Sequence, residues 1–200
     1  MVFLCGCASM KAGSEVAYGR RALLGGDNET ALGYFQSALN EDPNYQYGTA
    51  YQQGLLSYVG RTEYLTGRLP QARETLQKAL AAKKDEDIAR IYLGLTLIRT
   101  NDRETGLRDV ETGMRGIHDW LEWVTEAHRF SFGQFWDPAH AIRSAIQSDL
   151  AMISGLDLDW QRVVTDGEWV AMRMEAEGDK ARNDEQRERQ RDSEGKDGTR

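Results

Sequence analysis

Cysteine, proline and histidine are scarce in this chain of 200 residues, and the scarcity excludes several kinds of protein. Both cysteines, Cys5 and Cys7, lie at the start, so a disulfide framework within the body of the chain is excluded. The three histidines, His118, His128 and His140, have spacings that match no zinc-binding motif. We therefore expect no metal ion and no other cofactor.

The sequence also lacks the patterns that carry catalysis. No serine lies in a Gly-x-Ser-x-Gly context, and no glycine-rich phosphate loop follows a predicted strand. No apolar run is long enough for a transmembrane helix. The net charge is −7, which disfavours nucleic acid as a partner. These absences predict a protein without enzymatic activity.

A pattern of small residues is present three times between Gly19 and Gly113. The three copies share one internal spacing: Gly19, Gly26, Ala31, Phe35 and Ala38; Gly60, Gly67, Ala72, Leu76 and Ala79; and Gly94, Asn101, Gly106, Val110 and Gly113. Gly60 and Gly94 are 34 residues apart, and Gly19 and Gly60 are 41 apart. A period near 34 indicates a repeated helix–turn–helix unit.

The chemistry of each copy agrees with a helical hairpin. The second position, Gly26, Gly67 or Asn101, can take the left-handed conformation in which a helix ends. The small residues after it allow a second helix to approach closely, and the large residue fills the gap. We expect paired helices at residues 12–25 and 29–41, 47–66 and 69–82, and 86–100 and 103–126. The seven extra residues between the first two copies predict a longer loop or helix around 44–51.

This pattern resembles the tetratricopeptide repeat (TPR) family, and Pro43 falls where that family usually has a proline. The third copy departs from the family, because it has glycine in place of both alanines and no closing proline. The resemblance covers about half of the chain. It implies an all-α, TPR-like array of about three hairpins that binds a protein partner. The alternative is an unrelated helical bundle with accidental spacing.

In the TPR family the first helix of each hairpin lines a concave groove. By that analogy, Arg20, Arg61, Tyr64 and Arg99 are the expected partner-binding residues. Two arginines on one wall would suit a carboxylate of the partner. Ordinary surface arginines with solvated heads are the alternative.

The first residues resemble a lipoprotein signal. Leu4-Cys5-Gly6-Cys7 is similar to the lipobox of bacterial lipoproteins, with Cys7 as the lipidated residue. Only six residues precede Cys7, fewer than a secretory signal peptide has, so we expect the true start to lie further upstream. The resemblance implies a membrane anchor at Cys7 and, because no aspartate follows the cysteine, the outer membrane facing the periplasm. A cytosolic N-terminus with two free thiols is the alternative.

All five tryptophans lie between residues 116 and 174, the first two of them on the last repeat helix, and a charged tail follows. A cap at Asp137 before Pro138, apolar residues at helical spacing, and a second cap at Asp157 or Asp159 predict helices that cover the end of the array. A tryptophan-rich groove for a peptide or glycan is the alternative. The mixed charges from residue 175 predict a solvated helix to about Arg191, unable to bury a core, and then disorder.

The expected organisation is therefore a lipobox and linker (1–11), repeats (12–126), capping helices (127–174) and a charged tail (175–200). It predicts a lipid-anchored protein of the cell envelope that acts as a scaffold or assembly factor. A soluble cytosolic adaptor is one alternative, and a basic, apolar reading frame upstream of Met1 would argue against it. An enzyme acting on glycans through Asp157, Asp159 and Asp166 is a weaker one.

Overall fold

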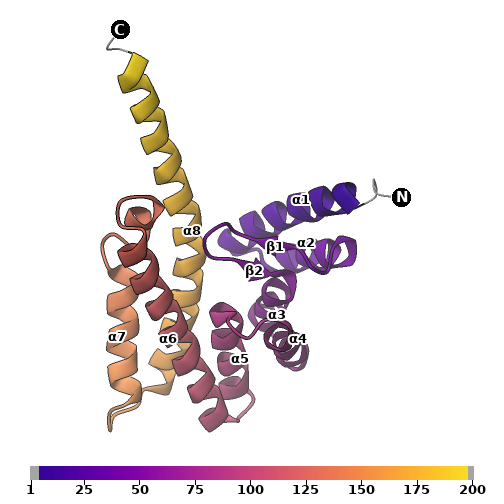
Figure 1. Ribbon diagram of the computed structural model, residues 1–200. Helices are drawn as coiled ribbons and strands as arrows, with labels where there is room; N and C mark the ends of the chain where they lie inside the picture. Colours follow the sequence, from indigo (N-terminus) through magenta and orange to yellow (C-terminus); the bar gives the residue numbers. More distant parts are fainter. Residues whose placement is uncertain (1–4, 198–200) are drawn as a thin grey trace.

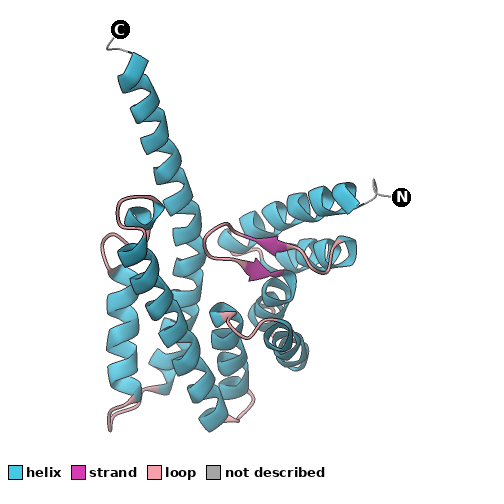
Figure 2. Cartoon of the chain, in the orientation of Figure 1, coloured by secondary structure: helices cyan, strands magenta, loops and turns pink. Residues whose placement is uncertain are grey.

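The computed structural model describes residues 5–197, with side chains for residues 9–191, and it confirms the all-α class (Figures 1 and 2). The helices are α1 (Cys5–Leu24), α2 (Asn28–Glu41), α3 (Leu55–Leu65), α4 (Leu69–Ala82), α5 (Asp87–Arg99), α6 (Arg103–Ala127), the 3₁₀ helix η1 (Phe132–Phe135), α7 (Ala141–Ile153) and α8 (Trp160–Asp197). A small antiparallel sheet, β1 (Gln46–Tyr47) and β2 (Gln53–Gly54), is the strand content of the described residues.

The first six helices form three successive hairpins, α1–α2, α3–α4 and α5–α6. Each hairpin turns at the residue that the sequence pattern indicates. Gly26, Gly67 and Asn101 have φ angles of 81°, 78° and 73°, in the left-handed region that ends a helix. The hairpins therefore follow directly from the local sequence.

Close contacts between the two helices of each hairpin explain the small residues. A Cβ atom on Gly60 would lie 2.6 Å from the Leu76 side chain, and one on Gly94 would lie 2.5 Å from the carbonyl oxygen of Gly106. A Cβ atom on Gly19 would similarly meet Phe35. The other residues of the pattern are buried in the same contacts: Ala31, Ala38, Ala72, Ala79 and Val110.

The helix expected from residue 47 begins only at Leu55, so the prediction is wrong over residues 47–54. These residues form the β1–β2 hairpin instead, in which Tyr47 pairs with Gln53. Gly48, with φ 109°, has a conformation that no right-handed helix contains. The hairpin is the longer loop that the seven extra residues indicated.

Two of the predicted capping residues bind the first turns of the last helices, but the N-cap position of α7 is His140 and the helix begins at Ala141, so the prediction that Pro138 lies in its first turn is wrong. The carboxylate of Asp137 accepts hydrogen bonds from two backbone N–H groups at the start of α7, at 3.0 and 3.1 Å. Asp159, and not Asp157, does the same for α8, at 2.9 and 3.1 Å. Both carboxylates satisfy N–H groups that have no partner inside their helix.

Helix α8 is continuous across the expected boundary at residue 175. It runs between α6 and α7 on one side and the first hairpins on the other, and its end projects beyond the body (Figure 1). The expectation that residues 175–200 cannot bury a core is wrong, because Glu175, Glu177 and Ala181 are buried. The expected end of the helix near Arg191 is also wrong, since α8 extends to Asp197.

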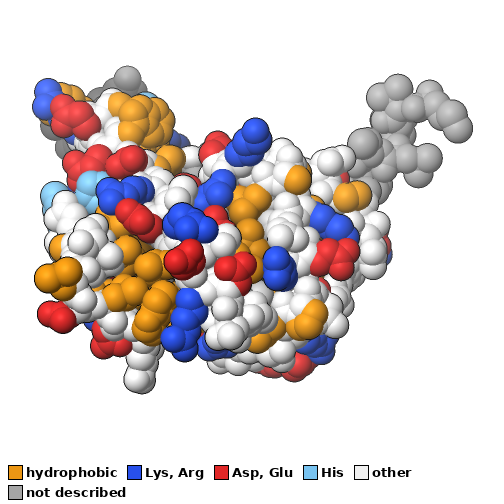
Figure 3. Space-filling view, turned by 90° about the horizontal axis from the view of Figure 1, so that it is seen from below, with side chains coloured by type: hydrophobic (Ala, Val, Ile, Leu, Met, Phe, Trp, Pro, Cys, Tyr) orange, Lys and Arg blue, Asp and Glu red, His pale blue; other side chains and the backbone are white. Residues whose placement is uncertain are grey.

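Two apolar clusters hold the helices together. One cluster contains residues of α1, α2 and α3. The other contains residues of each of the helices from α3 through α8. On the face in Figure 3, acidic and basic side chains lie next to one another, with hydrophobic side chains between them. Within residues 5–197, no helix combines the length and the hydropathy that a membrane span requires.

Candidate functional site

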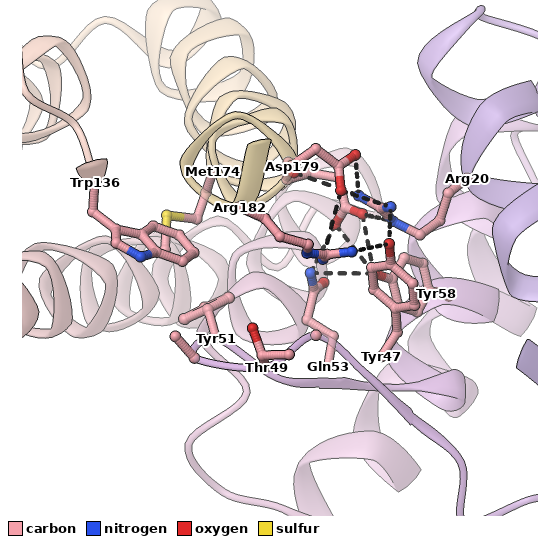
Figure 4. Close-up of a pocket in the computed structure, with 14 residues that line it drawn as sticks. Arg20, Tyr47, Thr49, Tyr51, Gln53, Tyr58, Trp136, Met174, Asp179 and Arg182 are labelled. Atoms are coloured by element: carbon pink, nitrogen blue, oxygen red, sulfur yellow. Dashed lines mark hydrogen bonds and ion pairs between the residues drawn. The ribbon is translucent and has the colours of Figure 1, made fainter. Parts of the chain in front are cut away.

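A buried carboxylate on α8 is the centre of the site (Figure 4). The side chain of Glu175 is 2% exposed and lies against α1, α3 and β2. It accepts hydrogen bonds from Gln53 Nε2 at 2.7 Å, Tyr58 Oη at 3.0 Å and Arg61 Nη1 at 3.1 Å, and it also pairs with Arg20 Nε. Two guanidinium groups, an amide and a phenol therefore surround one carboxylate.

Arg20 extends the network one turn further along α8. Its Nη2 atom pairs with Asp179 Oδ2 at 2.9 Å, and its Nη1 atom donates to the hydroxyl of Tyr47 at 2.6 Å. The Arg20 guanidinium also lies 4.1 Å from the centre of the Tyr47 ring. Arg182, on α8, donates to the same hydroxyl at 3.3 Å. The β1 strand is thereby fixed between α1 and α8.

A third acidic residue of α8, Glu168, contacts the second and third hairpins. The Tyr64 hydroxyl donates to Glu168 Oε1 at 2.6 Å, and Arg99 Nη2 pairs with the same oxygen at 3.1 Å. The Arg99 guanidinium lies 4.3 Å from the centre of the Tyr64 ring. Glu168, Glu175 and Asp179 are spaced by seven and four residues, so they share one face of α8.

All four residues expected to bind a partner contact α8 of the same chain. Arg20 and Arg61, expected on an open groove wall, are only 6% and 2% exposed. Tyr64 is fully buried, and Arg99 is paired with Glu168. The structure thus brings the four predicted groove residues together. The acidic side chains that they contact belong to α8 of the same chain and not to an external partner.

The charge of Glu175 is stabilised by its partners. Burial alone would raise the pKa of this carboxyl group, but Arg61 and Arg20 outweigh burial and lower the pKa to about 2. Burial and the Glu175 charge raise the pKa of Tyr58 well above its usual value. The carboxylate therefore stays ionised at neutral pH and is a poor proton donor or acceptor.

Some polar atoms of this network remain without a partner among the described residues. They are Arg61 Nε, Arg61 Nη2 and Gln53 Oε1. The cavity beside the network has a volume of about 20 Å³, which accommodates one water molecule but no organic ligand. The arrangement orients α8 and neutralises the charges of Glu175 and Asp179.

Larger cavities lie where α8 leaves the body. One of about 480 Å³ is lined by the β1–β2 turn, Phe132, Trp136 and the α8 residues Arg182 and Arg189. Another of about 220 Å³ is lined by Phe130, Phe132 and Phe135 with Arg189. Phe130 is 87% exposed and Trp123 is 55% exposed. We call this surface the aromatic face: Trp123, Phe130, Phe132 and Phe135 with Glu185 and Arg189.

The remaining predicted residues have structural partners or lie outside the described side chains. Asp159 caps α8, and Asp166 pairs with Arg162 at 2.9 Å. Among the described residues, no group of three or more His, Cys, Asp or Glu side chains is arranged to hold a metal ion. Cys7 is in the first turn of α1, where the structure describes only the backbone, so its lipidation stays a prediction.

Sequence reasoning missed Glu175 and Gln53. The spacing of Glu168, Glu175 and Asp179 places them on one face of a helix, but it does not indicate what that face contacts. Comparison of this chain with protein-family models, with curated proteins and with solved structures found no match.

Proposed function

We propose that this chain is a non-enzymatic scaffold, built from TPR-like hairpins, that binds a protein partner through its aromatic face. The observation that carries this proposal is the exposure of Phe130, which lines the smaller cavity, and of Trp123, which contacts His128 next to Phe132. Aromatic residues and arginine are enriched at protein interfaces and supply most of the binding energy there.

The concave groove is the less suitable partner surface, because α8 fills it. Opening the groove would separate Glu175 from Arg20 and Arg61. The opposite face of α8 carries Val163, Val170 and other buried residues of the larger apolar cluster, so α8 is held from both sides. A partner for the groove would have to replace both sets of contacts.

We also propose that Cys7 anchors the protein in the bacterial cell envelope, at the outer membrane facing the periplasm. The lipobox-like Leu4-Cys5-Gly6-Cys7 supports this proposal. Acyl chains contribute roughly 0.8 kcal/mol per buried methylene, so more than one chain gives stable anchoring. A soluble adaptor with the same aromatic face is the second candidate.

The anchor predicts a change in fractionation. Expressed with its natural upstream sequence, the wild-type protein is expected in the membrane fraction with acyl label. Cys7→Ser should be unlabelled and released, because the thioether attachment point is lost. Cys5→Ser is the matched control and should behave as wild type. Identical fractionation of all three proteins without label would favour the soluble adaptor.

The aromatic face predicts a position-specific cross-link. A photo-reactive benzoylphenylalanine at Phe130 is expected to give a discrete adduct with one protein in cells, identified by mass spectrometry. The same residue at Leu156, which is fully exposed in the α7–α8 loop, is the control and should give none. Phe130→Ser should weaken capture of that protein by at least about tenfold, as truncation of an interface anchor does.

Two outcomes would contradict this assignment. One is a cross-link from position 156 and none from position 130. The other is loss of capture in Arg99→Ala with capture retained in Phe130→Ser. That result would show that the partner binds in the groove and not at the aromatic face.

A further inference from the structure

The charge network around α8 contains one more guanidinium group than it has carboxylates. Arg20 and Arg61 share Glu175, and Arg20 also holds both oxygens of Asp179, at 2.9 and 3.1 Å. The third guanidinium group, that of Arg182, is 3.7 Å from Asp179 Oδ1, an oxygen that Arg20 already occupies. One positive charge of the network therefore has no carboxylate of its own.

Arg182 also has a hydrogen-bond donor that is not used. Its Nε atom is buried and has no partner among the residues whose side chains the structure describes. Its Nη1 atom donates to the hydroxyl of Tyr47 at 3.3 Å, which is a neutral acceptor. A buried donor without an acceptor is costly, and a donor on a cation forms its strongest hydrogen bond with an anion.

This arginine faces a cavity that is large enough for a small molecule. Arg182 lines the cavity of about 480 Å³ and also the small cavity of the charge network, so the two adjoin (Figure 4). Gly178 and Ala181 leave room on the α8 side, and the rings of Phe132 and Trp136 provide apolar walls. Small-molecule sites in proteins have volumes of about 300–1,000 Å³ and the same mixture of apolar walls and few polar groups.

The other charged residues of the lining do not oppose an anion. Glu185, the acidic residue of this cavity, pairs with Arg189 at 2.5 Å, so their charges compensate each other. The charge that remains in the lining is that of Arg182, and it is positive. The cavity thus combines apolar walls with a single uncompensated cation.

We propose that this cavity binds a small organic acid, in which one carboxylate is attached to an apolar ring or branched chain. The carboxylate accepts hydrogen bonds from Arg182, and the apolar part lies between Phe132 and Trp136. Arginine suits a carboxylate in geometry and charge, and removal of apolar surface from water favours binding of the remainder. The site shares Phe132 with the aromatic face, but it does not depend on a protein partner.

The experiment is an NMR titration of the purified full chain with 3-phenylpropionate at pH 7, where the probe is ionised. 3-Phenylpropanamide has the same shape without the charge, and acetate has the charge without the ring. We expect saturable shifts of the Trp136 indole N–H and the Ala181 amide with 3-phenylpropionate, and binding weaker by about tenfold or more for both controls. Preferential binding of N-acetylphenylalanine would assign the site to the end of a polypeptide and overturn the small acid.

Variants assign the binding to this cavity. Arg182→Gln removes the charge and should weaken binding of 3-phenylpropionate by about tenfold. Ala50→Leu, on the β1–β2 turn, keeps the charge but fills part of the cavity, and it should weaken binding as well. Arg187→Gln, at an exposed position of the same helix, is the control and should bind as wild type.

Three results would overturn the proposal. They are equal binding of the amide, no saturation with 3-phenylpropionate, and unchanged binding by both Arg182→Gln and Ala50→Leu. Because the titration uses the purified chain alone, its result is independent of whether a cross-link forms at Phe130.

Discussion

Glu175→Gln is expected to destabilise the protein by about 3–5 kcal/mol, the cost of leaving a buried charge without its partner. In wild type the carboxylate neutralises Arg61 and Arg20, which are both buried. Glutamine keeps the shape but not the charge, so the buried Arg61 would lose its acidic partner and Arg20 would keep only Asp179. Urea unfolding followed by circular dichroism measures the difference.

The matched control for this prediction is Glu188→Gln, at an exposed position of the same helix, which should change stability by less than about 0.5 kcal/mol. Replacing both partners, as in Glu175→Met with Arg61→Met, should recover part of the loss, because an apolar pair leaves no unpaired charge in its place. If Glu175→Gln and Glu188→Gln unfold at the same urea concentration, the charge network does not hold α8.

The same carboxylate gives the protein a stability that depends on pH. The pKa of Glu175 is lowered from its usual 4.5 to about 2, so the folded state favours the ionised form. Its contribution is complete above pH 4.5 and is lost as the pH falls towards 2. The difference in stability between wild type and Glu175→Gln should therefore shrink over that interval.

Gly94→Ala is expected to cost about 1–3 kcal/mol, or more, because its added methyl group meets backbone rather than a movable side chain. The new Cβ atom would lie 2.5 Å from the Gly106 carbonyl oxygen and 2.7 Å from the Val110 backbone nitrogen. Helices α5 and α6 would have to separate. Thermal unfolding should show a clearly lower midpoint.

Gly33→Ala is the control, because it is the same substitution in another hairpin. Gly33 lies inside α2, and a Cβ atom there would have no neighbour within 4 Å. Alanine is the better helix former by about 0.5–1 kcal/mol, so this variant should be more stable than wild type. Two variants with similar midpoints would show that α5 and α6 do not pack through Gly94.

The sequence predicted those parts of the fold that depend on local chemistry. Gly26, Gly67 and Asn101 end helices because few residues tolerate a left-handed conformation, and a pattern of such residues is visible without a structure. The close packing of the two helices in each hairpin could be predicted for a similar reason, since only small residues fit where two helices approach so closely. Both features join residues near each other in the chain.

The position of α8 could not be predicted in this way. Its acidic residues lie among many arginines, and mixed charge is typical of solvated helices. The pairing of Glu175 with Arg61 joins residues far apart in sequence, and no local pattern reports such a contact. Sequence reasoning therefore identified the arginines of the groove but assigned them to an external partner.

The distance along the chain between Arg61 and Glu175 also bears on synthesis. They are 114 residues apart, and ribosomes add about 5–20 residues per second, so the arginine precedes its carboxylate by roughly 6 to 23 s. During that interval the first two hairpins exist with Arg20 and Arg61 unneutralised. In a nascent chain whose first two hairpins have folded, both arginines therefore lack Glu175 and Asp179 until α8 has been synthesised.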